Sequence, residues 1–211
     1  MNMSNFKKIF LLIFIAMIVF ILAQRGSQPV HKYNRQDYKH WIDADGDCQN
    51  TRQEVLISES LEKVKLDESG CKVVSGKWHD SYTDKDFTDP HELDIDHFIP
   101  LKEVDRSGGE FWSTEKKMLY ANDLDDAETL IAVSKSANRA KGDKDPLHWM
   151  PQNQKYHCEY IRNWVRVKMK WHLVMDEEEK NFIEHQRKIC EANLEKKTGN
   201  VSLMQSKAGG K

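Results

Sequence analysis

The chain begins with an apolar run and continues with shorter stretches in which hydrophobic and polar positions alternate. Residues 9–23 are fifteen consecutive apolar residues after Lys7 and Lys8, a pattern typical of an export signal. As a helix they would rise roughly 22 Å, short of the roughly 30 Å hydrocarbon core, which favours a cleaved signal peptide. Residues 21–23 are only a fair cleavage site, so an uncleaved membrane anchor stays open. Both interpretations place the rest of the chain outside the cytoplasm, secreted, periplasmic or anchored to the membrane by this segment alone.

The pattern that follows indicates one domain between a linker and a tail. Residues 24–37 are polar and form the predicted linker, and residues 38–195 form the predicted domain. Residues 196–211 are polar and predict a disordered tail. Near the start of the domain, Thr51 and Glu54 have the spacing of a capping box and predict the beginning of a helix.

The centre of the domain predicts two strands and a helix, with a long excursion between the strands. In residues 93–99, apolar and acidic positions alternate with the period of a strand that ends at Pro100. Residues 129–133 are a second short run rich in β-forming residues. Ser134 then predicts the start of a helix that Gly142 ends.

Composition and charge narrow the class of protein. The 211 residues are 39% hydrophobic and 31% charged, which is typical of a globular domain with extensions. The formal net charge is -2, so no overall basic field attracts nucleic acid, and any binding of a polyanion must be local. Such a local basic cluster occurs near the predicted central helix, where a solvated helix end is the alternative interpretation. Its members are Lys135, Arg139, Lys141 and Lys144.

The cysteines agree with export. The chain has four cysteines, an even number that predicts two disulfides in an exported protein. Among the possible pairings, we favour Cys48 with Cys71 and Cys158 with Cys190. A zinc site is the competing interpretation, but no two cysteines have the short spacing of a zinc knuckle.

Asp96, His97 and Asn138 carry the clearest chemistry in the sequence. Cleavage of a phosphodiester needs a water activated by a general base and a hard divalent cation that neutralises charge on the phosphate. Asp96 and Asn138 can supply the oxygen ligands that Mg²⁺ prefers, and His97, with an ordinary pKa of about 6.5, suits the role of the base. A lone histidine in an apolar strand is more often a hydrogen-bonded core residue. The combination of the three residues favours a one-metal nuclease.

Basic residues extend this candidate site. Lys141 shares a helix face with Asn138, so we expect both side chains to touch the same phosphate. Arg139 points elsewhere and, like Lys135, is a candidate for contact with the flanking backbone of the substrate. Arg52 is a further candidate for a phosphate contact, with a structural salt bridge as the alternative.

Asp96 and His97 are neighbours in the predicted strand, which sets a geometric requirement. Adjacent strand residues point to opposite faces, so the two side chains can serve one site only if the strand bends or ends there. The nearby Pro100 is compatible with such an end.

Many spaced residues carry a resemblance to a known family. They are Trp41-x-Asp43-x-Asp45 through Cys48, Thr51-Arg52 and Val55-Leu56, Asp96-His97-x-x-Pro100-Leu101, Ser107-Gly108 with Phe111-Trp112, Ala121-Asn122-Asp123-Leu124, and the run from Ser136 through Asn138-Arg139, Lys141-Gly142-Asp143 and Asp145-Pro146 to Trp149 and Pro151. The chain resembles the HNH endonucleases and, more narrowly, an exported group related to the C-terminal nuclease part of the GmrSD restriction enzyme. The resemblance extends from about residue 41 to residue 174.

This resemblance implies a fold, an activity and roles for single residues. The implied fold is α+β, a ββα-metal (HNH, or His-Me finger) core with additional helices, and the implied activity is endonuclease cleavage of DNA. Asp96 would be a metal ligand, His97 the general base, Asn122 the residue that fixes the loop carrying the base, and Asn138 the second ligand. Without the resemblance, an ordinary turn residue is an equally good interpretation of Asn122. Many relatives have His where this chain has Asn138, which favours Mg²⁺ or Mn²⁺ over zinc or nickel.

Acidic residues before the first predicted helix suggest a second cation site. The residues at positions 1, 3, 5 and 12 of an EF-hand-like loop are Asp43, Asp45, Asp47 and Glu54. Cys48 stands where such a loop requires glycine, so a structural Ca²⁺ site competes with an acidic turn pinned by a disulfide.

The sequence therefore predicts an exported, metal-dependent and largely non-specific DNA endonuclease. In-line attack by water would leave 5′-phosphate ends, and nothing in the sequence resembles a helix dedicated to reading bases. RNA stays open as a substrate, and no obligate protein partner is implied. The alternative is a non-catalytic envelope module that binds nucleic acid or calcium, for example in DNA uptake.

Overall fold

The computed structural model describes residue 17 and residues 31–208, and side chains as far as residue 194. The predicted signal or anchor segment and most of the predicted linker lie outside the described residues. None of the helices in the described part of the chain is both long and apolar enough to span a membrane. The chain divides into two compact units, Met1–Lys32 and Tyr33–Lys211, and the elements below belong to the second.

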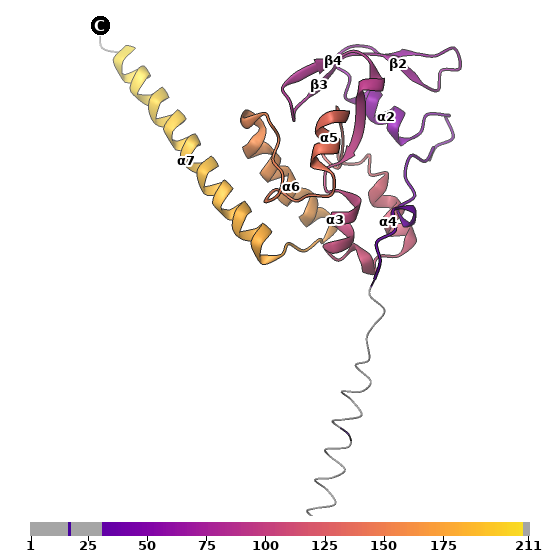
Figure 1. The fold of residues 1–211 in the computed structure, drawn as a ribbon. Coiled ribbons are helices and arrows are strands. Elements are labelled where there is room, and N and C mark those ends of the chain that lie inside the picture. Colours follow the sequence, from indigo (N-terminus) through magenta and orange to yellow (C-terminus); the bar gives the residue numbers. More distant parts are fainter. Residues whose placement is uncertain (1–16, 18–30, 209–211) are drawn as a thin grey trace, which may run out of the picture. The chain divides into compact units, whose positions relative to one another are not determined.

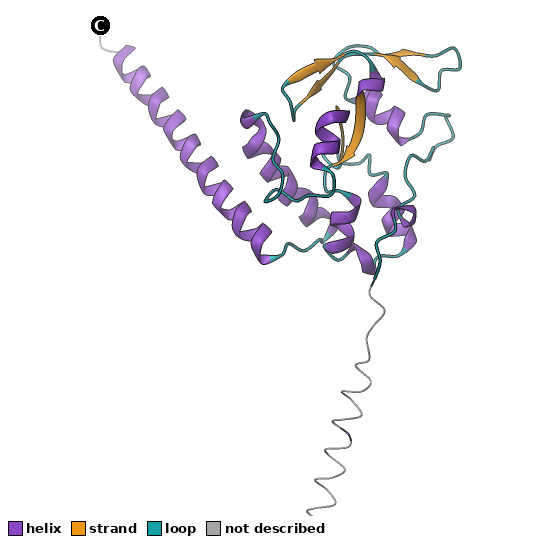
Figure 2. Ribbon diagram, viewed as in Figure 1, coloured by secondary structure: helices purple, strands orange, loops and turns teal. Residues whose placement is uncertain are grey.

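The second unit is a mixture of helices and short antiparallel strand pairs, an α+β fold (Figures 1 and 2). In chain order its elements are η1 (Arg35–Asp37), α2 (Thr51–Ser58), β1 (Lys65–Leu66), β2 (Val73–Ser75), β3 (Trp78–Asp80), β4 (Lys85–Phe87), η2 (Pro90–Glu92), β5 (Leu93–His97), α3 (Leu101–Arg106), η3 (Gly109–Phe111), α4 (Thr114–Ala121), β6 (Leu130–Ser134), α5 (Lys135–Lys141), η4 (Gln154–Tyr156), α6 (His157–Trp171) and α7 (Glu177–Ala208).

The pair β5–β6 is the centre of the fold and is followed directly by α5. The strands are antiparallel, and their register runs from Leu93 opposite Ser134 to His97 opposite Leu130. The excursion between them contains α3, η3 and α4. The predicted order of strand, excursion, strand and helix is therefore confirmed. The first strand ends at His97, two residues earlier than the alternation suggested, because the chain turns into α3 at Pro100.

Local hydrogen bonds explain the ends of α5 and correct one prediction for α2. The Ser134 hydroxyl accepts from the backbone N–H of Ala137, and Gly142 ends the helix with a positive φ of 58°. At α2, Asn50 is the capping residue and accepts from Gln53 N–H, so the predicted capping box of Thr51 and Glu54 is wrong. The Thr51 hydroxyl donates to more distant groups instead, which the sequence pattern does not reveal.

Two hydrophobic clusters lie on either side of the β5–β6 pair. One contains Leu93 and Ile95 of β5 together with residues of α2, β2, β3 and β6. The other joins Phe98, just beyond β5, with residues of α3, α4, α5, α6 and α7. Because side chains alternate along a strand, Asp94 and Asp96 face away from the first cluster.

Both predicted disulfides are present. Cys48 is bonded to Cys71, and Cys158 of α6 is bonded to Cys190 of α7. Helix α7 continues to Ala208, into the stretch after residue 195 for which composition predicted disorder. That stretch contains Lys, Leu, Met, Gln and Ala, which have high helix propensity and can continue a helix that packs against α6 at its start.

Candidate active site

Asp96 lies on the face of β5 that α5 covers. Its side chain is buried, and its Oδ2 atom accepts hydrogen bonds from the Tyr82 hydroxyl at 2.8 Å and from the Lys141 ammonium group. Burial raises the pKa of Asp96, whereas the Lys141 charge and the two hydrogen bonds oppose that rise. The carboxylate is therefore fixed in orientation by one phenol and one ammonium group.

Lys141 is completely buried and uses its three N–H donors on protein groups. Besides Asp96, it donates to the backbone carbonyl oxygens of His97 at 3.1 Å and Phe98 at 2.9 Å. The shared helix face with Asn138 predicted that Lys141 contacts a phosphate, but its ammonium group ties the end of α5 to the end of β5. A phosphate contact would require it to leave these three partners.

Asn138 lies one turn before Lys141 on α5 and contacts a different carboxylate. Its Nδ2 atom donates to Asp94 Oδ2 at 3.1 Å. Asp94 was not among the predicted site residues, although its position two residues before Asp96 on the same strand face was a usable signal. The α5 face of β5 thus gathers two carboxylates and one amide.

The oxygen atoms of this group fit a hard divalent cation. Asp96 Oδ1 and Asn138 Oδ1 accept no hydrogen bond from the described side chains or backbone. Asn138 is half-buried, whereas Asp96 is 4% exposed. Carboxylate and amide oxygens that are not used on protein donors are the ligands that Mg²⁺ prefers, with water or phosphate completing the shell.

His97 lies at the last position of β5 and points away from α5. Its ring is buried, and Nε2 lies 3.0 Å from the carbonyl oxygen of Ala121 at the end of α4. A carbonyl oxygen can only accept, so Nε2 carries the hydrogen and Nδ1 keeps its lone pair. Burial lowers the pKa of His97 to about 3; the hydrogen bond to Ala121 opposes this, and the charges of Arg35, His40 and Lys141 add smaller lowering effects. The imidazole is therefore neutral at neutral pH.

Asp96 and His97 occupy opposite faces of β5. The register with β6 continues without a bulge through His97, so the strand ends beside the pair and does not bend at Asp96. The structure brings Asp96, Asn138 and Lys141 together on the α5 side and places the His97 ring against α4. Lys141 connects the two sides through the His97 carbonyl.

Asn122 makes four hydrogen bonds around the end of α4. Its Oδ1 atom accepts from Ile42 N–H at 3.2 Å and from the Thr51 hydroxyl at 2.8 Å. Its Nδ2 atom donates to the carbonyl oxygens of Lys39 and Met118, each at 2.8 Å. These bonds join α4 to the segment before α2 and fix the chain directly after the Ala121 carbonyl that His97 binds.

The remaining predicted phosphate contacts are separated by the structure. Arg52 donates to the backbone carbonyls of Pro90 and Leu93 at 3.0 Å each, so it braces the start of β5. Arg139 is exposed and, in the described part of the chain, has no ion-pair partner. Lys135, at the start of α5, is half-buried.

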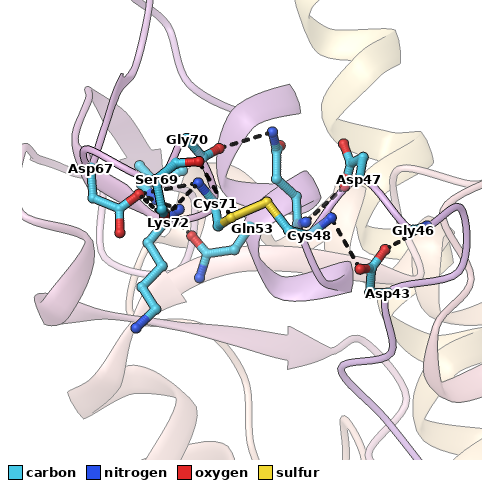
Figure 3. The surroundings of a disulfide bond; sticks show 12 residues. Asp43, Gly46, Asp47, Cys48, Gln53, Asp67, Ser69, Gly70, Cys71 and Lys72 are labelled. Atoms are coloured by element: carbon cyan, nitrogen blue, oxygen red, sulfur yellow. Dashed lines mark hydrogen bonds between the residues drawn. A yellow bond between two sulfur atoms is a disulfide. The ribbon is translucent and has the colours of Figure 1, made fainter.

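The acidic loop after Ile42 lies beside the first disulfide, where Figure 3 shows Asp43 and Asp47. One ligand atom each of Asp43, Asp45 and Asp47 lies within 4.8 Å of the others, and all three residues are exposed. Asp43 accepts from the backbone N–H of Cys48, which has a positive φ of 74° and thus takes the conformation that glycine would favour. The Oε2 atom of Glu54 is buried without a partner, and burial together with these carboxylates raises the pKa of Glu54.

Comparison with known proteins identifies the kind of domain. Residues 50–186 match the family described as GmrSD restriction endonucleases, C-terminal domain. The chain is 37% identical to an uncharacterized secreted protein of Arthroderma benhamiae over 169 residues. The aligned region covers 80% of this chain and 81% of that protein. No solved structure matches the chain.

The family match covers more than half of the chain and includes the β5–β6–α5 unit. It supports a nuclease-type hydrolase that acts on nucleic acid, and HNH-like nuclease domains generally use a divalent metal ion. The secreted relative and the two disulfides are consistent with export. The chain belongs to the family of the C-terminal domain of the GmrSD restriction endonucleases.

Proposed function

We propose that the protein is an exported, metal-dependent HNH endonuclease that hydrolyses phosphodiester bonds of DNA with little sequence preference. In this proposal His97 is the general base, and Asp96 and Asn138 hold one Mg²⁺ or Mn²⁺ ion. The observation that supports it most is the β5–β6–α5 unit, which carries the Oδ1 atoms of Asp96 and Asn138, unused on described protein donors, and a neutral histidine at the strand end.

The protein groups around the proposed ligands hold them in place. Lys141 and Tyr82 occupy Asp96 Oδ2, which leaves Oδ1 for the ion. Asp94 binds the Nδ2 atom of Asn138 and so turns the amide oxygen outward. A bound divalent cation supplies charge neutralisation at the phosphate oxygens and at the leaving 3′-oxygen. Lys141 acts in this proposal by orienting Asp96, because its donors are used on protein groups.

His97 accepts the proton of the attacking water at Nδ1. Its Nε2–H is committed to the Ala121 carbonyl, which stabilises the ring as it gains charge. Asn122 fixes the chain beside that carbonyl. The exposed Arg139 and the half-buried Lys135 are available for phosphates of the flanking backbone, contacts that carry no sequence information.

Cleavage of supercoiled plasmid tests the proposal. We expect nicking by the full chain with Mg²⁺ or Mn²⁺, none with EDTA, and a loss of at least about 100-fold in His97→Ala. His91→Ala is the matched control, since this histidine is exposed and its ring bonds only Asp89 within the described part of the chain. A parallel reaction on single-stranded RNA determines whether RNA is also cut. Metal-independent cutting, or equal cutting by His97→Ala, would refute the assignment and leave the non-catalytic envelope module as the better reading.

A structural Ca²⁺ ion in the acidic loop is a second part of the proposal. The close carboxylates of Asp43, Asp45 and Asp47 and the unpartnered Glu54 oxygen support it. Calorimetric titration of the full chain with CaCl₂ should give a dissociation constant on the order of 10⁻⁴–10⁻³ M, as in extracellular modules. No heat of binding, or equal binding by Asp45→Asn, would leave a disulfide-pinned acidic turn.

A further inference from the structure

The segment of residues 38–42, here called the strap, has an uncommon backbone conformation. Trp41 has a positive φ of 59°, a region that bulky residues rarely adopt. Such a conformation persists only where surrounding contacts enforce it, and it often occurs at functional sites. The strap runs from the buried Tyr38 to Ile42, directly before the acidic loop.

The side-chain amide of Asn122 holds the strap on both sides of Trp41. Its Nδ2 atom donates to Lys39 O at 2.8 Å, and its Oδ1 atom accepts from Ile42 N–H at 3.2 Å. The Thr51 hydroxyl adds bonds to Asn122 Oδ1 at 2.8 Å and to Ile42 O at 3.0 Å. These contacts explain how the left-handed conformation at Trp41 is maintained.

The strap places the Trp41 ring against His97. The two rings are stacked, with centroids 5.5 Å apart and planes at 29°. On another side, Tyr120 of α4 stacks on the same imidazole at 6.2 Å and 26°. His40 meets the imidazole edge-on, at 5.9 Å and 86°. Tyr120 is itself fixed, because it is completely buried and its hydroxyl donates to Ile99 O.

We propose that Trp41 is a positioning residue for His97: together with Tyr120 it clamps the imidazole so that Nε2 stays on Ala121 and Nδ1 faces the reacting water. The inference rests on the proposed function in taking His97 as the base. A neutral imidazole has two tautomers and can also rotate by a half turn, and either change would remove the lone pair from Nδ1's present position. Stacking by Trp41 and Tyr120 opposes that rotation, and the Ala121 carbonyl selects the tautomer.

Nitrogen NMR of the full chain tests the clamp without reference to catalysis. The ¹⁵N signals of His97 are identified by their loss in His97→Ala. In the wild-type protein we expect one tautomer, with the proton on Nε2. Trp41→Leu should give a mixture of tautomers and lose the ring-current shift of the His97 protons, whereas Trp41→Phe should keep both signatures. The Nδ1-protonated tautomer in the wild type, or an unchanged spectrum in Trp41→Leu, would overturn the proposal.

Kinetics give the second measurement. We expect kcat of Trp41→Leu to fall roughly 10- to 100-fold, as small misplacements of a catalytic group do, with KM nearly unchanged. Trp41→Phe should recover most of the loss. The matched control is Trp112→Leu, which removes an aromatic neighbour of Tyr120 at 5.9 Å and leaves His97 untouched. Wild-type kcat in Trp41→Leu, or an equal loss in Trp112→Leu, would contradict a specific role of Trp41. A wild-type protein that cuts no DNA would refute the proposed function alone, because the tautomer measurement still decides whether the clamp exists.

Discussion

Replacement of Lys141 by methionine is the sharpest perturbation of the candidate site. Methionine keeps a long, apolar stem but removes the ammonium group that binds Asp96 and the carbonyl oxygens of His97 and Phe98. Because Lys141 is completely buried, no water molecule from bulk solvent takes over these contacts directly. We therefore expect Lys141→Met to lose stability and nuclease activity together.

The size of the effect follows from the contacts removed. Deleting one partner of a buried ion pair costs about 3–5 kcal/mol, because the other charge stays buried without compensation. The two carbonyl oxygens each lose one hydrogen bond, at about 1 kcal/mol apiece. Uptake of a proton by Asp96 limits the penalty, since burial already raises the pKa of that carboxyl. We expect a loss of about 4 kcal/mol, or roughly 8–16 °C in Tm for a domain of this size.

Urea unfolding at pH 7, followed by circular dichroism, measures this loss. The double variant Asp96→Asn with Lys141→Met removes both charges and should be less destabilised than the sum of the single variants by about 2–3 kcal/mol. Lys144→Met is the control, because Lys144 is exposed and, among the residues that the structure describes, its ammonium group binds only the Ala140 carbonyl. A loss under about 1 kcal/mol in Lys141→Met, or strict additivity in the double variant, would refute the reasoning.

Three further predictions concern the surroundings of the site. Burial raises the pKa of Glu59 to about 7. Its contribution to stability is therefore full below about pH 4.5 and is lost as pH rises through 7, by up to about 3 kcal/mol. Glu59→Gln should flatten this part of the stability–pH curve, and an unchanged curve would contradict the raised pKa. Asn122→Ala removes four hydrogen bonds and should cost about 3 kcal/mol in urea unfolding, with a loss under about 1 kcal/mol counting against its bracing role. The double variant Cys158→Ser with Cys190→Ser should lower the free energy of unfolding by about 3–4 kcal/mol. Full reduction of both proteins should abolish this difference from wild type. A difference that persists after reduction would show that loss of the disulfide is not its cause.

The β5–β6–α5 unit could be predicted because the sequence features that define it lie within the unit itself. Alternation predicted the first strand and a run of β-forming residues the second, and the Ser134 cap and Gly142 defined the helix within one or two residues. The same alternation placed Asp96 and His97 on opposite faces, which the structure retains. The disulfide pairs were also predictable, since few pairings exist for four cysteines.

Contacts between distant segments could not be predicted in this way. The partners of Lys141 depend on the depth at which α5 packs on β5, which a helix-face argument does not contain. Trp41 lies 56 residues before His97 in the chain, and it stacks on that ring from a left-handed backbone conformation that its residue type disfavours. Thr51 matched a capping box, but its hydroxyl is used on Ile42 and Asn122 instead. In each case a long-range contact replaced the local one.

The smallest fragment that can work as this nuclease is longer than the stretch by which the family is recognised. The family match begins at residue 50 and ends at residue 186. A fragment cut at those ends would lack Cys48 and Cys190 and would carry two unpaired thiols at Cys71 and Cys158. It would also lose Trp41, one of the rings that stack on His97. A gene fragment for expression should therefore start no later than Tyr33 and end beyond Cys190. With a shorter fragment, a loss of activity would result from the truncation itself.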